Sequence, residues 1–172
     1  DQVLAIEQLA SLLPEGWKIV VKENPKQNYF QRGEFFFKRI KAIKDVIFVS
    51  KTLETYDLVE NCKLAATITG TVGWEAITGG KPVVIFGKCV WYGRFHGVFK
   101  FSKEMNLEEV SRFKVVHQKV ENDYHELKKK TFKGSVYGFN DLKTQSEIEL
   151  NGKNVFEALS TILRYKKERI EK

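Results

Sequence analysis

Apolar residues occur along the chain either at helical spacing or in short continuous runs, and these two patterns predict alternating helices and strands. Apolar side chains in residues 3–13 recur at helical spacing until Pro14-Glu15-Gly16 ends the pattern, so an opening helix is expected there. Short apolar or β-branched runs predict strands at residues 17–21, 46–49, 64–69, 82–86 and 98–101. Helices are expected at residues 34–43, 55–61, 72–78, 107–113, 117–130 and 155–172, with a polar, turn-rich stretch at 134–152.

Strands and helices that alternate in this way indicate right-handed βαβ units. The predicted fold class is therefore α/β, an open doubly wound, Rossmann-like parallel sheet of about five strands with helices on both faces. The run Pro82-Val83-Val84-Ile85-Phe86 has no polar alternation, which is typical of a strand buried on both faces of such a sheet. We expect one domain over residues 1–172, in which residues 104–172 form a mainly helical tail.

The net charge bears on the class of partner. The 172 residues carry a formal charge of +7, but the basic excess is +2 in residues 1–50, +2 in 51–100 and +3 in 101–172. A nucleic-acid-binding protein usually concentrates its charge on one face or tail, so no nucleic acid is expected as a partner. The one tight cluster, Lys128-Lys129-Lys130 with Lys133, is either a solvated helix end or a peripheral contact with an anionic membrane surface.

Composition favours a soluble protein in a reducing compartment. Hydrophobic residues make up 42% of the chain and charged residues 30%, and no apolar stretch approaches the ~20 residues that span a bilayer. The residues after Asp1 do not resemble a signal peptide, and Cys62 and Cys89 lack the spacing of a zinc site or of a disulfide framework. We expect a cytoplasmic protein, at the inner face of the cell membrane if the lysine cluster contacts lipid, and no metal.

The strongest chemical signal is the loop Thr69-Gly70-Thr71-Val72-Gly73, which joins a predicted buried strand to a helix. Glycines let a ligand approach the backbone, unpaired amides at a helix start attract anions, and threonine hydroxyls add hydrogen bonds to phosphate oxygens. The other interpretation is a tight turn in which Thr71 is an ordinary helix cap. The spacings GxxxxGK[ST] and GxGxxG are both absent, which argues against ATP-driven and nicotinamide chemistry.

Other candidate residues follow neighbouring strands, whose carboxyl ends share one edge of an open parallel sheet. Glu75, in the first turn of the next helix, either accepts hydrogen bonds from ribose hydroxyls or complements the helix dipole. Lys22, Glu23, Asn24 and Arg32 follow the first strand, where the two cations suit a phosphate or sugar carboxylate unless the loop is merely solvated. The aromatic loop after the fourth strand, which contains Tyr92, either clasps a base or sugar ring or packs internally.

Four stretches together carry a family resemblance. They are Lys22 to Pro25, Phe48-Val49-Ser50, the segment TYDLVENCKLAATITGTVGWEAITGGKPVVIFG over residues 55–87, and Trp91-Tyr92. Over about residues 17–100 the chain resembles capsule and surface-polysaccharide biosynthesis proteins, among them the Kdo transferases that build the lipid linker of the capsule. These proteins look like GT-B glycosyltransferases.

The resemblance implies the C-terminal, nucleotide-sugar-binding half of a two-domain glycosyltransferase, whose N-terminal half supplies most of the acceptor site. Nucleotide phosphate and ribose would then be bound by Thr69, Gly70, Thr71, Gly73 and Glu75, with Lys22 and Arg32 assisting. Such relatives commonly have His where this chain has Asn24, and Asn can donate a hydrogen bond but cannot carry a proton's charge near neutrality.

The implied co-substrate is a CMP- or UDP-linked sugar, with no other cofactor, and the implied acceptor is a glycan or glycolipid. The catalytic base is not located in the sequence. Two other functions stay open: a non-catalytic nucleotide- or carbohydrate-binding module, and a UDP-sugar 2-epimerase-like enzyme. The epimerase-like enzyme would require a set of carboxylates and histidines that act as acid and base. The sequence shows no such set.

Overall fold

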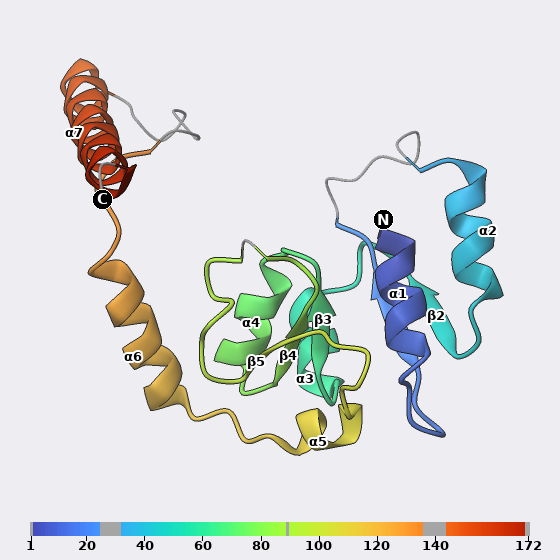
Figure 1. Ribbon diagram of the computed structural model, residues 1–172. Helices are drawn as coiled ribbons and strands as arrows, with labels where there is room; N and C mark the ends of the chain where they lie inside the picture. Colours follow the sequence, from blue (N-terminus) through green and yellow to red (C-terminus); the bar gives the residue numbers. More distant parts are fainter. Residues whose placement is uncertain (1, 25–31, 89, 136–143, 171–172) are drawn as a thin grey trace. The chain divides into compact units, whose positions relative to one another are not determined.

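The computed structural model describes residues 2–24, 32–88, 90–135 and 144–170, and the side chains of the last helix up to residue 164 (Figure 1). The chain divides into two compact units, Asp1–Tyr124 and His125–Lys172. The candidate site residues all fall in the first unit. Each unit is described below by itself.

Helices and strands follow one another in the predicted order. They are α1 (Gln2–Ala10), β1 (Ile19–Lys22), α2 (Glu34–Ala42), β2 (Val46–Val49), α3 (Thr55–Asn61), β3 (Ala65–Thr67), α4 (Val72–Thr78), β4 (Val83–Ile85), β5 (Val98–Lys100), α5 (Leu107–Arg112), α6 (His117–Lys128) and α7 (Gln145–Ile170). The mixed α/β class is therefore confirmed. No helix in the described ranges combines the length and the apolar character needed to cross a bilayer.

The strands pair in parallel, but in two small sheets rather than in one. β1 pairs with β2 in the register Ile19 to Val46, and the second sheet has the order β3-β4-β5, with Val83 as the partner of both Ala65 and Val98. The prediction of a single sheet of about five strands was wrong. The parallel direction of each pair agrees with the predicted βαβ units.

The reason for this error lies in what a local pattern encodes. Each crossover, β1-α2-β2 and β3-α4-β4, joins strands that are neighbours in the sequence, so alternation of elements predicts their pairing. A single sheet would also need a pair between strands from the two groups, which no local pattern specifies. Side-chain packing joins the groups instead, because Ile19 of β1 and Val84 of β4 belong to one buried cluster.

That cluster is the core of the first unit. Its buried members come from α1, both sheets and α5: Leu9, Ile19, Val84, Leu107 and Val110. Burial of one such aliphatic side chain contributes about 1.5–3 kcal/mol, so these contacts hold α1 and α5 against the strands. Successive side chains of a strand point to opposite faces, so Val83 and Ile85 point away from this cluster. All three β4 residues are buried, which confirms the predicted strand buried on both faces.

Helix α4 packs on β3 and β4, and this packing positions the loop that precedes it. The buried side of α4 consists of Gly73, Ala76 and Ile77. The helix ends at Thr78 with Gly79 as its C-cap, and Gly80 has φ +79°, a conformation that favours glycine. The predicted stop at this glycine pair is confirmed.

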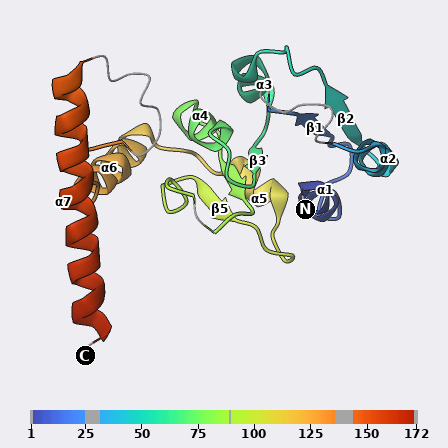
Figure 2. The ribbon, with the colours of Figure 1, turned by 90° about the horizontal axis from the view of Figure 1, so that it is seen from above.

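In the second unit, α7 is one unbroken helix, drawn in orange to red in Figure 2. It begins at residue 145, ten residues before the predicted start, so the expectation of a turn-rich stretch over residues 145–152 was wrong. Thr144 and Glu147 form a reciprocal cap: the Glu147 amide donates to Thr144 Oγ1 at 3.3 Å, and the Thr144 amide donates to Glu147 Oε2 at 2.9 Å. The Thr-x-x-Glu spacing is the sequence signal of this start.

Candidate functional site

Residues 69–71, in the loop between β3 and α4, are exposed. One amide of this loop is used internally, since Gly70 N donates to Thr67 Oγ1 at 3.0 Å. Gly73 N donates to Gly70 O at 3.3 Å. Within the part of the chain that the structure describes, the amides of Thr71 and Val72 have no hydrogen-bond partner. These two amides are therefore the donors that the loop offers to an anion.

Thr71 does not cap α4 with its side chain. The residue has φ −65° and ψ −19°, which is helical backbone, and its hydroxyl makes no capping hydrogen bond. Its carbonyl oxygen instead accepts from Glu75 N at 3.1 Å. Thr71 thus stands at the N-cap position, as the alternative interpretation expects, but its hydroxyl does not cap the helix and is left for another partner.

Tyr92 supports the loop from inside the protein. Its side chain is fully buried, and its hydroxyl donates a short hydrogen bond to Gly70 O. A Cβ at position 73 would lie 2.7 Å from Cε2 of the Tyr92 ring, too close for any residue but glycine. The glycine in helix α4 is thus explained by a packing contact. In this conformation Tyr92 offers no surface to a ligand. It can contribute to a site only by holding the loop in position.

The environment of Tyr92 also affects its ionisation. Burial raises the pKa of the Tyr92 phenol; a hydrogen bond from the Gly73 backbone opposes this shift, and the negative charge of Glu75 adds to it. Glu75 is half-buried in the first turn of α4, so its carboxylate lies within electrostatic reach of the loop. Tyr92 therefore stays a neutral hydrogen-bond donor over the physiological pH range.

A cation that the sequence reasoning missed lies beside this loop. Gly87 N donates to Ile68 O at 2.9 Å, and a Cβ at Gly87 would lie 2.6 Å from Cγ2 of Thr69. The chain after β4 therefore runs against the chain after β3. The next residue, Lys88, is exposed. Its position after a buried strand, in a loop already under consideration, was the available signal.

An aromatic cluster adjoins the same loop through α4. The Trp74 ring lies 4.9 Å from Trp91, 6.0 Å from Phe95 and 5.7 Å from Tyr124, measured between ring centroids. Trp91 and Tyr124 are partly exposed, whereas Phe95 is buried. Such pairs contribute about 0.5–1.5 kcal/mol each beyond their burial. Trp74 therefore has a packing role, which links α4 to the loop after β4.

The candidates after β1 are held by contacts of their own. Lys22 Nζ donates to Thr55 Oγ1 at 3.1 Å, and Arg32 Nε pairs with Glu23 Oε1 at 3.1 Å. The Arg32 guanidinium also donates to Gln2 and lies 4.4 Å from the centroid of the Phe36 ring. Both cations are thus engaged within the first unit. Asn24 is exposed.

No group of three or more His, Cys, Asp or Glu side chains in the described ranges is placed to hold a metal ion. The residues that the structure brings together are those of the loop between β3 and α4, with Tyr92 beneath it and Lys88 beside it. Thr69, Gly70, Thr71 and Lys88 are exposed and follow two paired parallel strands, and the Thr71 and Val72 amides have no hydrogen-bond partner within the described residues. This arrangement can bind an anionic group such as a phosphate.

Comparison with known proteins gives a family. The family model for "Capsule polysaccharide biosynthesis protein" matches residues 3–100, which include strands β1 to β5, the loop before α4, Lys88 and Tyr92. No curated protein matches the chain, and no solved structure does. The family match covers more than half of the 172 residues. The chain belongs to the capsule polysaccharide biosynthesis protein family.

Proposed function

We propose that this chain carries the donor-binding site of a GT-B-type glycosyltransferase that acts in capsule polysaccharide biosynthesis. The donor is a nucleotide sugar, CMP- or UDP-linked, and the acceptor is a glycan or glycolipid. The observation that carries the proposal is the pair of unpartnered amides, Thr71 N and Val72 N, on an exposed loop between a strand and a helix. In the proposed complex these amides donate to an oxygen of the nucleotide phosphate.

The chemistry of glycosyl transfer gives such a site its use. When the bond between the anomeric carbon and the phosphate oxygen breaks, negative charge develops on the leaving nucleotide. Fixed donors aimed at that charge stabilise the transition state without having to reorganise. In the proposal, Lys88 adds a positive charge beside the amides, and the Thr69 and Thr71 hydroxyls add hydrogen bonds. Tyr92 acts as a positioning residue, because it touches the loop and not the donor.

Glu75 is proposed as the acceptor for the ribose hydroxyls. It follows the phosphate loop by one helical turn and is half-buried, so its carboxylate is partly sheltered from water. A carboxylate can accept from both hydroxyls of a ribose at once.

A specific observation favours a second candidate, a non-catalytic nucleotide- or carbohydrate-binding module. The first-loop cation Arg32 already pairs with Glu23, and Asn24 cannot supply a proton. Both candidates predict nucleotide binding. Only the transferase predicts that free nucleotide accumulates when the chain, with any further domain of the parent protein, is given a nucleotide sugar and an acceptor glycan.

The test of the donor site is calorimetric titration of the chain with CMP, UDP and GDP. Two substitutions at one position separate the amide from the hydroxyl. Thr71→Pro removes the N–H at a residue whose φ of −65° already suits proline, whereas Thr71→Ala keeps the N–H and removes only the hydroxyl. The proposal predicts binding of at least one nucleotide, a loss of about ten-fold or more in Thr71→Pro, and a smaller loss in Thr71→Ala. Equal affinities in all three proteins would contradict it.

A further inference from the structure

The long helix α7 leaves an apolar stripe uncovered. Three of its large apolar side chains are strongly exposed: Phe156 by 71%, Leu159 by 54% and Leu163 by 66%. Residues three and four apart lie on one side of a helix, so these three form a continuous stripe that extends back through Gly152 to the exposed Ile148. We name the stripe Ile148, Phe156, Leu159 and Leu163 the α7 apolar face.

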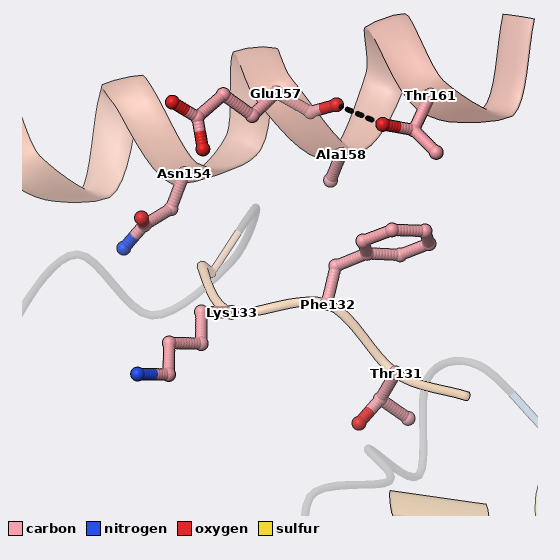
Figure 3. A pocket seen from close by; sticks show the side chains of 7 residues that line it. All are labelled: Thr131, Phe132, Lys133, Asn154, Glu157, Ala158 and Thr161. Carbon is pink, nitrogen blue, oxygen red and sulfur yellow. Dashed lines mark hydrogen bonds between the residues drawn. The ribbon is translucent and has the colours of Figure 1, made fainter. Parts of the chain in front are cut away.

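Another side of the same helix is already covered. Asn151 is buried and exchanges two hydrogen bonds with Ser135: Ser135 N donates to Asn151 Oδ1 at 2.7 Å, and Asn151 Nδ2 donates to Ser135 O at 3.0 Å. A hollow of about 320 Å³ lies between residues 131–133 and α7, where Phe132 and Ala158 face each other (Figure 3). The segment before α7 thus packs on one side of the helix. The α7 apolar face lies outside this contact.

The sequence of the second unit has an excess of basic residues. The second unit, His125–Lys172, contains 11 basic and 7 acidic residues, a net charge of +4 in 48 residues, whereas the first unit carries +3 in 124 residues. The basic residues include the run Lys128-Lys129-Lys130 before α7. They also include Arg164, Lys166, Lys167 and Arg169 in its last two turns, where the one acidic residue is Glu168. A helix with exposed Phe and Leu on one side, in a unit with an excess of Lys and Arg, is typical of binding in the plane of an anionic membrane.

We propose that α7 binds the surface of an anionic bilayer, with the α7 apolar face at the boundary of the acyl chains. The exposed basic residues Lys128, Lys129, Lys130, Lys133 and Arg164 then supply the attraction to the phosphate headgroups. A second copy of the chain fits the face less well, because a coiled coil needs apolar positions sustained over at least three heptads. The uncovered stripe spans 16 residues and contains the helix-weakening Gly152. This proposal does not depend on the nucleotide site of the first unit.

The test is flotation of the whole 172-residue chain with two kinds of vesicle, one of phosphatidylcholine alone and one with a quarter of phosphatidylglycerol. Binding to the anionic vesicles at low salt, much weaker at high salt, is expected because headgroup attraction is screened by salt. Phe156→Gln and Leu163→Gln should each reduce binding by about ten-fold or more, since each removes one buried apolar side chain. Leu150→Gln is the matched control, because Leu150 is 60% exposed on the same helix but lies about 120° around it from Phe156.

Circular dichroism shows whether each variant keeps the helix content of the unchanged chain. Three results would overturn the proposal. The first is no flotation of the unchanged chain with anionic vesicles. The second is a loss in Leu150→Gln as large as that in Phe156→Gln. The third is a dimer in solution that Phe156→Gln dissociates while vesicle binding stays absent, which would assign the face to a second copy.

Discussion

The hydroxyl of Tyr92 donates a hydrogen bond to the carbonyl oxygen of Gly70, across 22 residues of sequence. The same ring occupies the space that a side chain at position 73 would need. A residue of the loop after β4 therefore fixes the backbone of the loop after β3. The two amides proposed to bind phosphate, Thr71 N and Val72 N, lie between these two points of contact, so their direction depends on Tyr92.

Replacement of Tyr92 by Phe should lower the free energy of unfolding by about 1 kcal/mol near neutral pH, because one hydrogen bond is lost while the ring still fills its space. The measurement is urea unfolding followed by fluorescence. Tyr56→Phe, at an exposed position, is the control and should leave the free energy unchanged. An equal loss in both variants would show that the Gly70 contact does not stabilise the loop.

The same pair of proteins should respond differently to alkaline pH. The pKa of Tyr92 is raised in the folded protein, mainly by burial, so the folded state favours the protonated phenol. Its stabilising contribution is fully present below the unfolded pKa of about 10 and is lost as pH rises through the folded pKa. The difference in unfolding free energy between the unchanged chain and Tyr92→Phe should therefore shrink above about pH 10. A difference that stays constant to higher pH would contradict this account.

Gly73→Ala should destabilise the protein although alanine is the better helix former. Its Cβ would meet the Tyr92 ring at 2.7 Å, and overpacking of this kind costs about 1–3 kcal/mol. The gain in helix propensity is about 1 kcal/mol and does not offset the clash. Gly33→Ala, where an added Cβ meets nothing within 4 Å, provides the comparison and should be neutral or slightly stabilising. Thermal unfolding measures the change in Tm of each variant. An equal change in Tm for Gly73→Ala and Gly33→Ala would contradict the predicted clash with Tyr92.

Lys88→Gln should weaken nucleotide binding by about two- to five-fold, and the loss should be smaller at high salt, because an exposed charge contributes at most about 1 kcal/mol. Lys44→Gln removes an exposed lysine that precedes β2, and it should leave the affinity unchanged. Calorimetric titrations at two salt concentrations measure both effects. If the two lysine variants lost affinity equally, the effect would reflect net charge rather than a site.

Glu75→Gln tests the proposed ribose contact. A charged carboxylate accepts strong hydrogen bonds from sugar hydroxyls, so the unchanged chain should prefer a ribonucleotide to its 2′-deoxy form. In Glu75→Gln this preference should fall several-fold while the affinity for the deoxynucleotide stays nearly the same. Binding of both nucleotides weakened to the same extent would assign Glu75 to the support of the loop instead.

The sequence predicted well what local patterns encode. The apolar run of β4, the glycine pair after α4 and the order of the helices and strands each depend on residues close together in the chain. Helix α7 shows how a local signal is lost: Gly152 and the polar residues around it suggested turns, although Thr144 and Glu147 carry the spacing of a helix cap. Helix boundaries were therefore less predictable than helix existence.

Contacts between distant residues were not predictable in this way. Nothing in the sequence around Gly73 indicates that Tyr92 requires the glycine, and nothing around Arg32 indicates its pairing with Glu23 and Gln2. The division of the strands into two sheets is an error of the same kind. The loop between β3 and α4 was found because strand, glycine, threonine and helix are contiguous. Lys88 could have been found, because it follows a predicted buried strand that was expected to pair with β3, but attention in its loop went to the aromatic residues.

Amide NMR spectra of the isotope-labelled chain, recorded during titration with CMP and UDP, test the central claim most directly. The claim predicts saturable shifts of the Thr71 and Val72 amide resonances, larger than those of the Ser50–Leu53 turn after β2. If nucleotide left the Thr71 and Val72 resonances in place at every concentration, the donor site proposed for this loop would be contradicted.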